Sequence, residues 1–239
     1  MRVLSDSPVR INYGIRHLVL GSVALWLFAL PLYAEDWPQW RGPTRHGLWT
    51  ETGIVDRFPD DGLQVSWRVP IGAGFAGPVV ADGRVFVLDY QENLGSRTMD
   101  GAERLVCLDE ETGSVLWTSE WPATYRNIHV TFATGPRATP NVDGDRVYVV
   151  GAAGMVLCLD TQTGAVVWQV DTVEEYGATV PVFGVSTSPL VDDDRLIVLV
   201  GGSPDGLAIA FDKRNGNERW RALPLVSEAG YSAPLIYEA

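Results

Sequence analysis

The sequence predicts an all-β protein, an incomplete β-propeller of four-stranded antiparallel blades, with about three full blades, part of a fourth and a closing strand. Tryptophan recurs at intervals of 50, 51 and 52 residues, a period typical of propeller blades. Aspartate and glycine precede three of these tryptophans by eight and by four residues. Between them, residues rich in Val, Leu, Ile and Tyr alternate with period two, as in β-strands. The repeated positions are Trp67, Trp117, Trp168 and Trp220, then Asp109, Asp160 and Asp212, then Gly113, Gly164 and Gly216.

The N-terminal segment 1–34 has the features of a secretory signal peptide. Three arginines precede the apolar run LVLGSVALWLFALPLY (18–33), and the small Ala34 follows it. An uncleaved membrane anchor is the alternative, but the run is shorter than the roughly 20 residues that span a bilayer. The sequence therefore predicts an exported protein, periplasmic or extracellular, with no stable membrane span after signal cleavage.

The rest of the chain divides at the repeated residues. Each blade is expected to have a proline-bearing first strand, a second strand that starts at an arginine, a third that ends at the aspartate and a fourth that carries the tryptophan. The predicted segments are a signal peptide at 1–34, an N-terminal clip at 35–62, a closing outer strand at 63–69, blades at 75–121, 133–172 and 183–224, and the first strand of a truncated fourth blade at 230–239. Because closed propellers start near four blades, we expect a fragment that lacks roughly four more.

The spacing from aspartate to tryptophan has a physical explanation. The aspartate is expected to accept hydrogen bonds from backbone N–H groups of the turn that follows it. A glycine four residues later supplies the left-handed conformation that closes the hairpin without a Cβ clash. The fourth strand then starts in a fixed register, so each tryptophan emerges on the same face. Its indole, with up to roughly 250 Å² of buried surface, is predicted to fasten one blade to the next.

The two cysteines, Cys107 and Cys158, occupy the same position in successive repeats. Equivalent positions on neighbouring blades are expected to lie beyond the roughly 7 Å between Cα atoms that a disulfide allows. Both are therefore predicted to be buried small side chains. The first blade is also longer than the other two between its arginine and its aspartate, because it carries an insertion within YQENLGSRTMDGAE (90–103). This insertion is expected to be a solvated loop on a surface hairpin, since its acids lack the ligand spacing of a calcium loop.

Charge and motifs exclude several classes of function. Removing the three arginines and one aspartate of segment 1–34 leaves 15 basic and 29 acidic side chains, a net charge of −14. Such a surface repels phosphate backbones, so nucleic acid is not an expected partner. No Cys/His cluster supports a zinc site. The glycine-rich GAGFAG (72–77) precedes a proline-bearing strand instead of a helix, so it is not a nucleotide-binding loop.

The pattern D-x-x-T-G-x-x-x-W, present as DEETGSVLW (109–117) and DTQTGAVVW (160–168), resembles the pyrroloquinoline-quinone (PQQ)-type, tryptophan-docking repeat of the quinoprotein dehydrogenase-like superfamily. The segment DWPQWRGPTRHG (36–47) is similar to one that often begins exported members. The resemblance covers about residues 36–239 and implies the propeller fold. It does not select an activity, because the superfamily includes dehydrogenases that use PQQ and calcium as well as cofactor-free propellers of outer-membrane protein assembly.

For alcohol-oxidising members, the resemblance implies a quinone held between a tryptophan and a ring of two adjacent cysteines, with Glu, Asn and Asp on calcium and an Asp as base. This chain has no adjacent cysteines. We find no position onto which those catalytic residues can be carried. No catalytic or metal-binding residue is therefore predicted, and PQQ and calcium belong only to the alternative function.

Candidate binding residues lie in the long loops that join one blade to the next, at 124–138, 173–188 and 224–233. Loop length and aromatic content favour binding over mere connection. The channel-face candidates are Tyr125, His129 and Arg137, with Phe183 and Tyr231 as stacking surfaces. The structural alternative is that Arg137 pairs with a neighbouring acid or carbonyl and that His129 caps loop backbone. His46 in the clip is also interpreted as structural.

These observations favour a non-catalytic, exported propeller that acts as a periplasmic binding or assembly scaffold. Its expected partner is a protein or a small-molecule ligand at the propeller face. The alternative is a PQQ-dependent alcohol or sugar dehydrogenase whose cofactor residues lie partly outside this chain.

Overall fold

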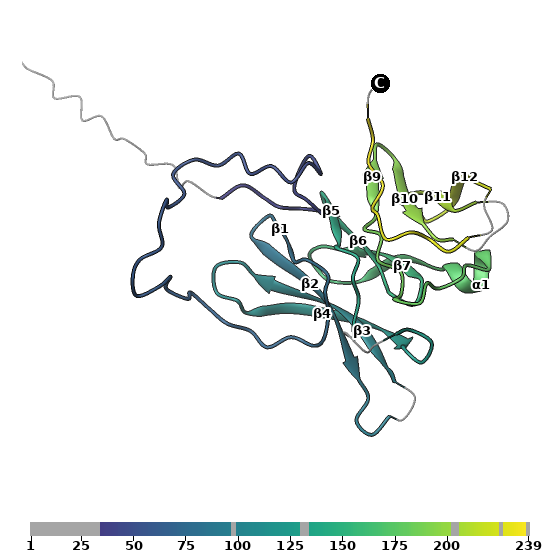
Figure 1. Cartoon of the computed structure of the whole chain (residues 1–239), viewed down its shortest axis with the longest axis horizontal. Helices are drawn as coiled ribbons and strands as arrows, with labels where there is room; N and C mark the ends of the chain where they lie inside the picture. The colour runs from purple at the N-terminus through teal and green to yellow at the C-terminus, as the bar shows by residue number, and fades with distance from the viewer. Residues whose placement is uncertain (1–33, 97–98, 130–133, 202–205, 225–226, 238–239) are drawn as a thin grey trace, which may run out of the picture. The chain divides into compact units, whose positions relative to one another are not determined.

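The computed structural model describes residues 34–96, 99–129, 134–201, 206–224 and 227–237. The predicted signal peptide lies outside the described residues, except for Ala34. The described residues form twelve β-strands and a short α-helix (Figure 1). Within them, no helix has the length and apolar character needed to cross a membrane.

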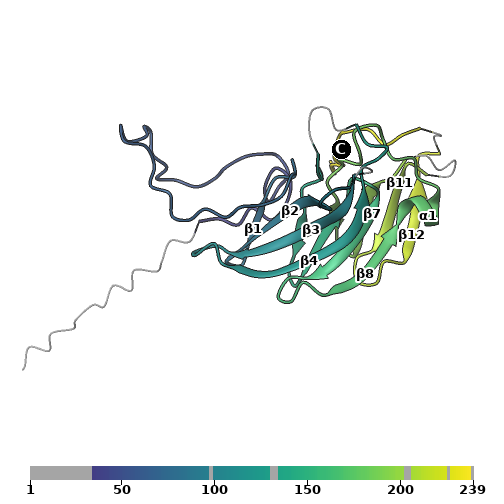
Figure 2. The same cartoon turned by 90° about the horizontal axis from the view of Figure 1, so that it is seen from below.

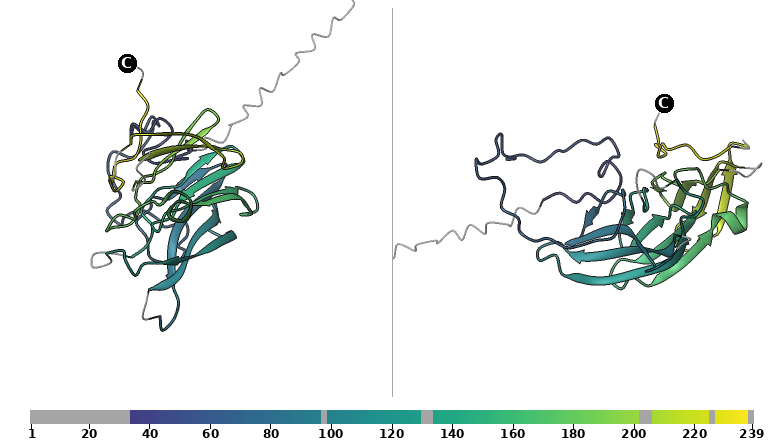
Figure 3. Two further views of the ribbon diagram at one scale, coloured as in Figure 1. Left: turned by 90° about the vertical axis from the view of Figure 1, so that its right-hand side faces the viewer. Right: turned by 60° about the horizontal axis from the view of Figure 1, so that its bottom comes forward.

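The strands form three four-stranded antiparallel sheets, and each sheet uses four consecutive strands. The first sheet contains β1 (Val79–Ala81), β2 (Arg84–Glu92), β3 (Asp100–Asp109) and β4 (Val115–Thr124). The second contains β5 (Asn141–Asp143), β6 (Arg146–Val150), β7 (Met155–Asp160) and β8 (Val166–Asp171), and the third contains β9 (Leu190–Asp192), β10 (Arg195–Leu199), β11 (Ala208–Asp212) and β12 (Glu218–Ala222). Figures 2 and 3 show the sheets side by side in chain order, teal to yellow. This arrangement is an incomplete propeller, so the predicted fold class is confirmed.

Strand ends fall at the repeated residues. The second strand of each sheet begins at an arginine, and the third ends at an aspartate that faces this arginine across the ladder. The pairs are Arg84 and Asp109, Arg146 and Asp160, and Arg195 and Asp212. In the second sheet, an Arg146 guanidinium nitrogen lies 3.1 Å from Asp160 Oδ2. Opposite charges therefore mark one end of the central ladder in each sheet.

The turn after each third strand is closed as predicted. Asp160 Oδ1 accepts hydrogen bonds from the hydroxyl and the backbone N–H of Thr163, both at 2.9 Å. Asp109 accepts the same pair from Thr112, at 2.6 and 2.8 Å. In both turns the threonine hydroxyl, helped by backbone N–H groups, stabilises the ionised carboxylate and lowers the pKa of the aspartate.

Each of three tryptophans packs on the turn of the blade that follows it. Trp117 Nε1 donates to the Thr161 carbonyl at 3.1 Å, and a Cβ on Gly164 would lie 2.5 Å from the Trp117 ring. Gly164 also has a φ of +70°, so this glycine serves both the backbone conformation and the close approach of the indole. The equivalent contacts join Trp67 to Glu110 and Gly113, and Trp168 to Lys213 and Gly216.

The residue opposite each fourth-strand tryptophan is small. Cys107, Cys158 and Ala210 are the direct cross-strand partners of Trp117, Trp168 and Trp220, and the register shifts immediately after each of them. A small side chain leaves room beside the indole, and a bulge changes the direction in which a side chain points. Both cysteines are buried and free, as predicted.

The hydrophobic core lies between neighbouring sheets. Along β7, Val156 and Cys158 belong to a cluster shared with the third sheet, and Leu157 and Leu159 belong to a cluster shared with the first. Both faces of a central strand are therefore buried, and the period-two alternation of the sequence assigns successive residues to different neighbours.

Two predicted end strands are not formed. No strand is described in residues 63–69 or in residues 230–237. A strand needs a hydrogen-bonded neighbour, and no described strand pairs with either segment. Trp67 nevertheless contacts the first sheet in the same way as the later tryptophans do.

The insertion in the first blade is an exposed surface hairpin at its tip, as expected, but it is not a loop throughout. It lengthens β2 and β3, which pair as far as Glu92 and Gly101. Tyr90 and Glu103, at the base of this hairpin, are 2% and 0% exposed. The insertion therefore contributes to the core as well as to the surface.

The short helix α1 (Thr172–Tyr176) was not predicted. It starts after Asp171, whose side chain accepts hydrogen bonds from the N–H groups of Val173 and Glu174 at 2.9 and 3.1 Å. It ends at Gly177, which has a φ of +61°. A helix this short does not show helical periodicity in a sequence.

The start of the predicted clip lies along the first strands of all three sheets. Trp37 forms two backbone hydrogen bonds with Val80 of β1, at 2.9 and 3.1 Å. Val142 of β5 donates to the Pro38 carbonyl at 2.8 Å. The Arg45 guanidinium donates to the carbonyl of Pro189, which directly precedes β9, at 2.9 Å. Residues 37–45 therefore connect the three blades through their first strands.

Candidate functional site

The loops between blades bring four of the five predicted binding residues together. The rings of His129 and Phe183 lie 5.6 Å apart between centroids, and those of Phe183 and Tyr231 lie 6.0 Å apart. Arg137 Nε donates to the Phe183 carbonyl at 2.8 Å. We call the cluster of Phe75, His129, Arg137, Phe183 and Tyr231 the loop-face site.

Phe75 is the member of this site that the sequence analysis missed. The Arg137 guanidinium lies over its ring, 5.1 Å from the centroid, a cation–π arrangement. The backbone fixes this pair, because Phe75 N–H donates to the Pro136 carbonyl at 2.8 Å. Gly135 permits the approach, since a Cβ there would lie 2.3 Å from the Ala73 carbonyl oxygen. The signal in the sequence was one large apolar residue between small ones in GAGFAG.

A cavity of about 310 Å³ adjoins the loop-face site. Its described lining combines aromatic, hydroxyl and guanidinium groups, and includes no Asp, Glu, His, Lys or Cys. Ser186 Oγ is buried there without a hydrogen-bond partner among the described residues. The lining residues are Trp40, Phe75, Gly77, Arg137, Thr139, Ser186, Ser188, Tyr231 and Ala233. These groups can stack on apolar groups and bind acceptors, and the described lining contains no carboxylate or imidazole.

Tyr125, the fifth predicted residue, is not part of this site. It is 1% exposed, and its hydroxyl donates to Glu103 Oε1 at 2.7 Å. Glu103 also accepts hydrogen bonds from Trp121 Nε1 at 3.0 Å and from the Ala152 N–H at 2.8 Å. Burial raises the pKa of Glu103, and the three hydrogen bonds only partly offset that effect. Burial also raises the pKa of Tyr125, as does the neighbouring carboxylate.

The Glu103 side chain contacts a second cavity, of about 400 Å³, which Trp121, Ile128 and Met155 also line. This buried acid was not among the residues predicted from the sequence. Its burial was indicated in the sequence, because Glu103 is in period-two register with the buried Leu105 and Cys107. Glu103 lies in the insertion, so neither of the other blades has an equivalent residue with which it could be compared.

The residues that a PQQ and calcium site requires are not brought together in the described part of the chain. No group of three His, Cys, Asp or Glu side chains there could hold a metal ion. Cys107 and Cys158 belong to different sheets, and burial raises the pKa values of their thiols to about 11 and about 12. The described residues therefore do not fit this cofactor, and we derive no reaction step through it.

The sequence matches the model of a known family. The model of that family, described as outer membrane protein assembly factor BamB, matches residues 51–232. This chain belongs to the BamB-like family of PQQ-like repeat propellers. A search of the curated proteins gave no match.

Among similar solved structures, a dehydrogenase shares the propeller fold. The quinohemoprotein alcohol dehydrogenase from Comamonas testosteroni is similar over 78% of this chain, with a TM-score of 0.50 and 22% identity. BamB from Moraxella catarrhalis is similar over 72% of this chain, with a TM-score of 0.36 and 22% identity. The chain covers 27% of the dehydrogenase and 51% of that BamB. At this identity, the likeness to the dehydrogenase concerns the fold alone.

Proposed function

We propose that this chain is an exported, non-catalytic propeller that binds extended protein segments at the loop-face site during the assembly of outer-membrane proteins. The observation that carries the proposal is the composition of the site, in which aromatic rings lie around one guanidinium and no carboxylate or imidazole lines the cavity among the described residues. The family description, an outer membrane protein assembly factor, supplies the process. The N-terminal sequence, with its signal-peptide features, supports a periplasmic location.

The chemistry of the site suits a polypeptide. Phe75 and Tyr231 are 54% and 52% exposed, so their rings are accessible to an apolar side chain of a partner. Tyrosine and arginine are enriched among the residues that dominate protein interfaces. The acidic surface of the chain also disfavours anionic polymers, which leaves protein as the favoured class of partner.

The test is binding of a fluorescently labelled, unfolded outer-membrane β-barrel protein, followed by fluorescence anisotropy. We expect Arg137→Ala and Tyr231→Ala each to weaken binding about tenfold or more. Arg126→Ala is the matched control, because it removes an exposed arginine from the same loop outside the cluster. Equal effects of the three substitutions would contradict the proposal.

A second measurement separates the scaffold from the dehydrogenase. The protein is titrated with PQQ and calcium, and dye reduction is followed with alcohols and sugars as substrates. We expect no saturable quinone binding and no dye reduction. Saturable binding with turnover would replace the scaffold by a PQQ-dependent dehydrogenase.

A further inference from the structure

Arg45, in the turn of the clip, carries a charge that the described protein does not neutralise. Its side chain is buried, with the residue only 4% exposed. Its guanidinium donates to Gln39 Oε1 and the Pro189 carbonyl at 2.9 Å, and to the Ser188 carbonyl at 3.3 Å. All of these acceptors are neutral. Arg45 Nε is buried and has no hydrogen-bond partner among the described residues.

An unpaired buried charge is costly, and proteins normally supply an acid beside it. Although the chain has 30 acidic residues, none that the structure describes forms an ion pair with Arg45. Burial lowers the pKa of Arg45 to about 10, so the side chain is still a cation at neutral pH. The indole ring of Trp40, 5.5 Å from the guanidinium carbon, gives only a cation–π contact.

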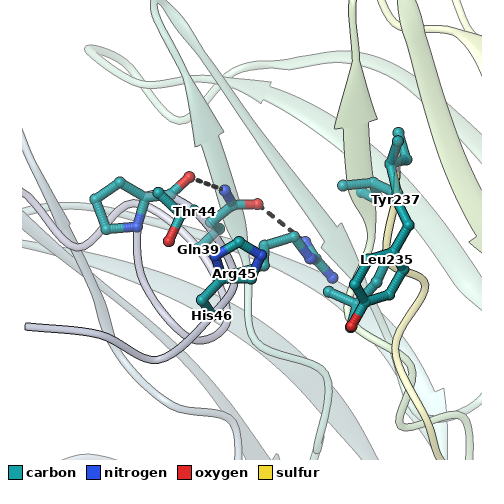
Figure 4. Close-up of a pocket in the computed structure, with 9 residues that line it drawn as sticks. Gln39, Thr44, Arg45, His46, Leu235 and Tyr237 are labelled. Atoms are coloured by element: carbon teal, nitrogen blue, oxygen red, sulfur yellow. Dashed lines mark hydrogen bonds between the residues drawn. The ribbon is translucent and has the colours of Figure 1, made fainter. Parts of the chain in front are cut away.

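A small cavity of about 180 Å³ adjoins this guanidinium. Figure 4 shows Arg45 extending from the clip, beside Gln39, toward Leu235 and Tyr237 on the opposite wall. The described lining residues are Gln39, Pro43, Thr44, Arg45, His46, Leu190, Leu235, Ile236 and Tyr237. None of them is acidic, and none lines the cavity of the loop-face site. The cavity therefore has one cationic wall and one apolar wall.

We propose that this cavity binds the carboxylate of a small organic anion, which pairs with the Arg45 guanidinium. A planar carboxylate matches the edge of a guanidinium, and the cavity adjoins the side chain of Arg45, whose acceptors within the described protein are all neutral. The short apolar part of the ligand packs against Leu190 and Leu235, and Tyr237 covers it. The volume is below the roughly 300 Å³ at which drug-sized ligand sites begin, so the ligand has only a few carbon atoms. The site is independent of the proposed function.

The test measures thermal unfolding of the full chain in sodium butyrate, with sodium chloride at equal ionic strength as the reference. A ligand that binds only the folded state raises the melting temperature in a saturable way. We expect butyrate, but not chloride, to give this saturable rise. Arg45→Gln should raise the half-saturating concentration at least about tenfold, whereas Arg41→Gln, which removes an exposed arginine of the same clip outside the cavity, should leave it within about twofold.

A second variant keeps the test informative if Arg45→Gln does not fold. Tyr237 is 76% exposed, so Tyr237→Ala should fold normally and still weaken butyrate binding several-fold. The proposal is overturned if butyrate acts no differently from chloride, or if both variants bind like the wild type. It is also overturned if a peptide with a single glutamate binds more tightly than butyrate. A butyrate response seen only in Glu238→Gln would overturn it too, because the chain's own acid would then supply the counter-charge.

Discussion

Among individual residues, Glu103 gives a testable pH dependence. Burial raises its pKa above the usual value of 4.5. An acid with a raised pKa in the folded state contributes stability that is fully present below the unfolded pKa, and this stability is lost as pH rises through the folded pKa. The hydrogen bonds from Tyr125, Trp121 and Ala152 fix the position of the Glu103 carboxyl group. We therefore attribute the expected pH dependence of stability to titration of Glu103 and not to a change in its position.

The comparison is with Glu103→Gln, whose amide does not titrate. The free energy of unfolding of the wild type, relative to this variant, should decrease as the pH rises above about 4.5, the ordinary pKa of the group. Urea denaturation at a series of pH values measures it. All other acids are common to both proteins, so a difference that stays constant with pH would show that Glu103 does not titrate in this range.

Gly164 gives a second prediction, with a control inside the same blade. Gly164→Ala meets both a positive φ and the Trp117 ring, whereas Gly144→Ala meets a φ of +58° with open space around it. We expect Gly144→Ala to cost about 1 kcal/mol and Gly164→Ala about 2–4 kcal/mol. Urea denaturation followed by tryptophan fluorescence measures both effects. Equal costs would mean that the indole moves away without strain.

The sequence predicted the turn residues well and the buried acid not at all, and the reason is physical. Asp109 and Gly113 act within one turn, and the same turn occurs three times in the chain, so comparison of the repeats reveals their roles. Glu103 acts through contacts with the next blade, including the Ala152 N–H, 49 residues away. Its alternation with Leu105 and Cys107 indicated burial, but no local pattern encodes this contact with the next blade.

Among the elements, the long hairpin of β2 and β3 depends on one buried ion pair. Arg104 Nε and Nη2 donate to the two Asp89 oxygens at 2.8 and 2.7 Å, and the Asp89 side chain is fully buried. Asp89 also accepts a hydrogen bond from the Gly72 N–H at 2.5 Å, which links the hairpin to the segment that carries Phe75.

We therefore expect Asp89→Asn to destabilise the fold by about 2–3 kcal/mol, somewhat less than for a fully buried pair because Arg104 is 21% exposed. Asp60→Asn is the control, since the Arg57–Asp60 pair is 85% and 92% exposed and should contribute less than about 0.5 kcal/mol. Urea denaturation compares the two variants. A cost at Asp89 no larger than at Asp60 would contradict the role given to the buried pair.

Elements with neighbours on both sides were predictable, and end segments were not. The pairing of β6 with β7, from Arg146 to Asp160, was predicted correctly. Both the alternation of apolar residues and the partner strand lie within one repeat. Residues 63–69 have strand-like composition but no described partner, and strand formation depends on pairing. Helix α1 depends on its caps, Asp171 and Gly177. Aspartate and glycine are also common in loops, so these two residues alone do not predict a helix.

At the scale of the whole molecule, we expect the tryptophan contacts between neighbouring blades to contribute much of the stability. Trp168 contacts Lys213 and Gly216 of the next blade, whereas Trp220 forms no hydrogen bond with any described turn. Trp168→Ala should therefore cost about 3–5 kcal/mol, and Trp220→Ala less than half as much. Urea denaturation of both variants tests this, and similar costs would contradict a stabilisation that runs through blade-to-blade contacts.

The loop-face site was only partly predictable, because it depends on the packing of the whole array. Chemical type and loop position were enough to select Arg137, Phe183 and Tyr231. Sequence could not show that Phe75, which precedes the first strand of the first sheet, would lie under the Arg137 guanidinium, nor that Tyr125 would turn into the core. Both outcomes depend on contacts between blades that do not repeat along the chain.

The path of the clip has a consequence for the order of folding. Trp37 pairs with Val80, and Arg45 contacts Pro189, 144 positions away, whereas each hairpin closes over a short turn. Contacts between distant residues form late, since the loop that they close must first lose its entropy. The blades must exist before residues 37–45 can lie across them. During synthesis, residues 37–45 emerge early but can complete these contacts only after Pro189 has been made, so we expect their docking to follow the placement of the first strands of the three sheets.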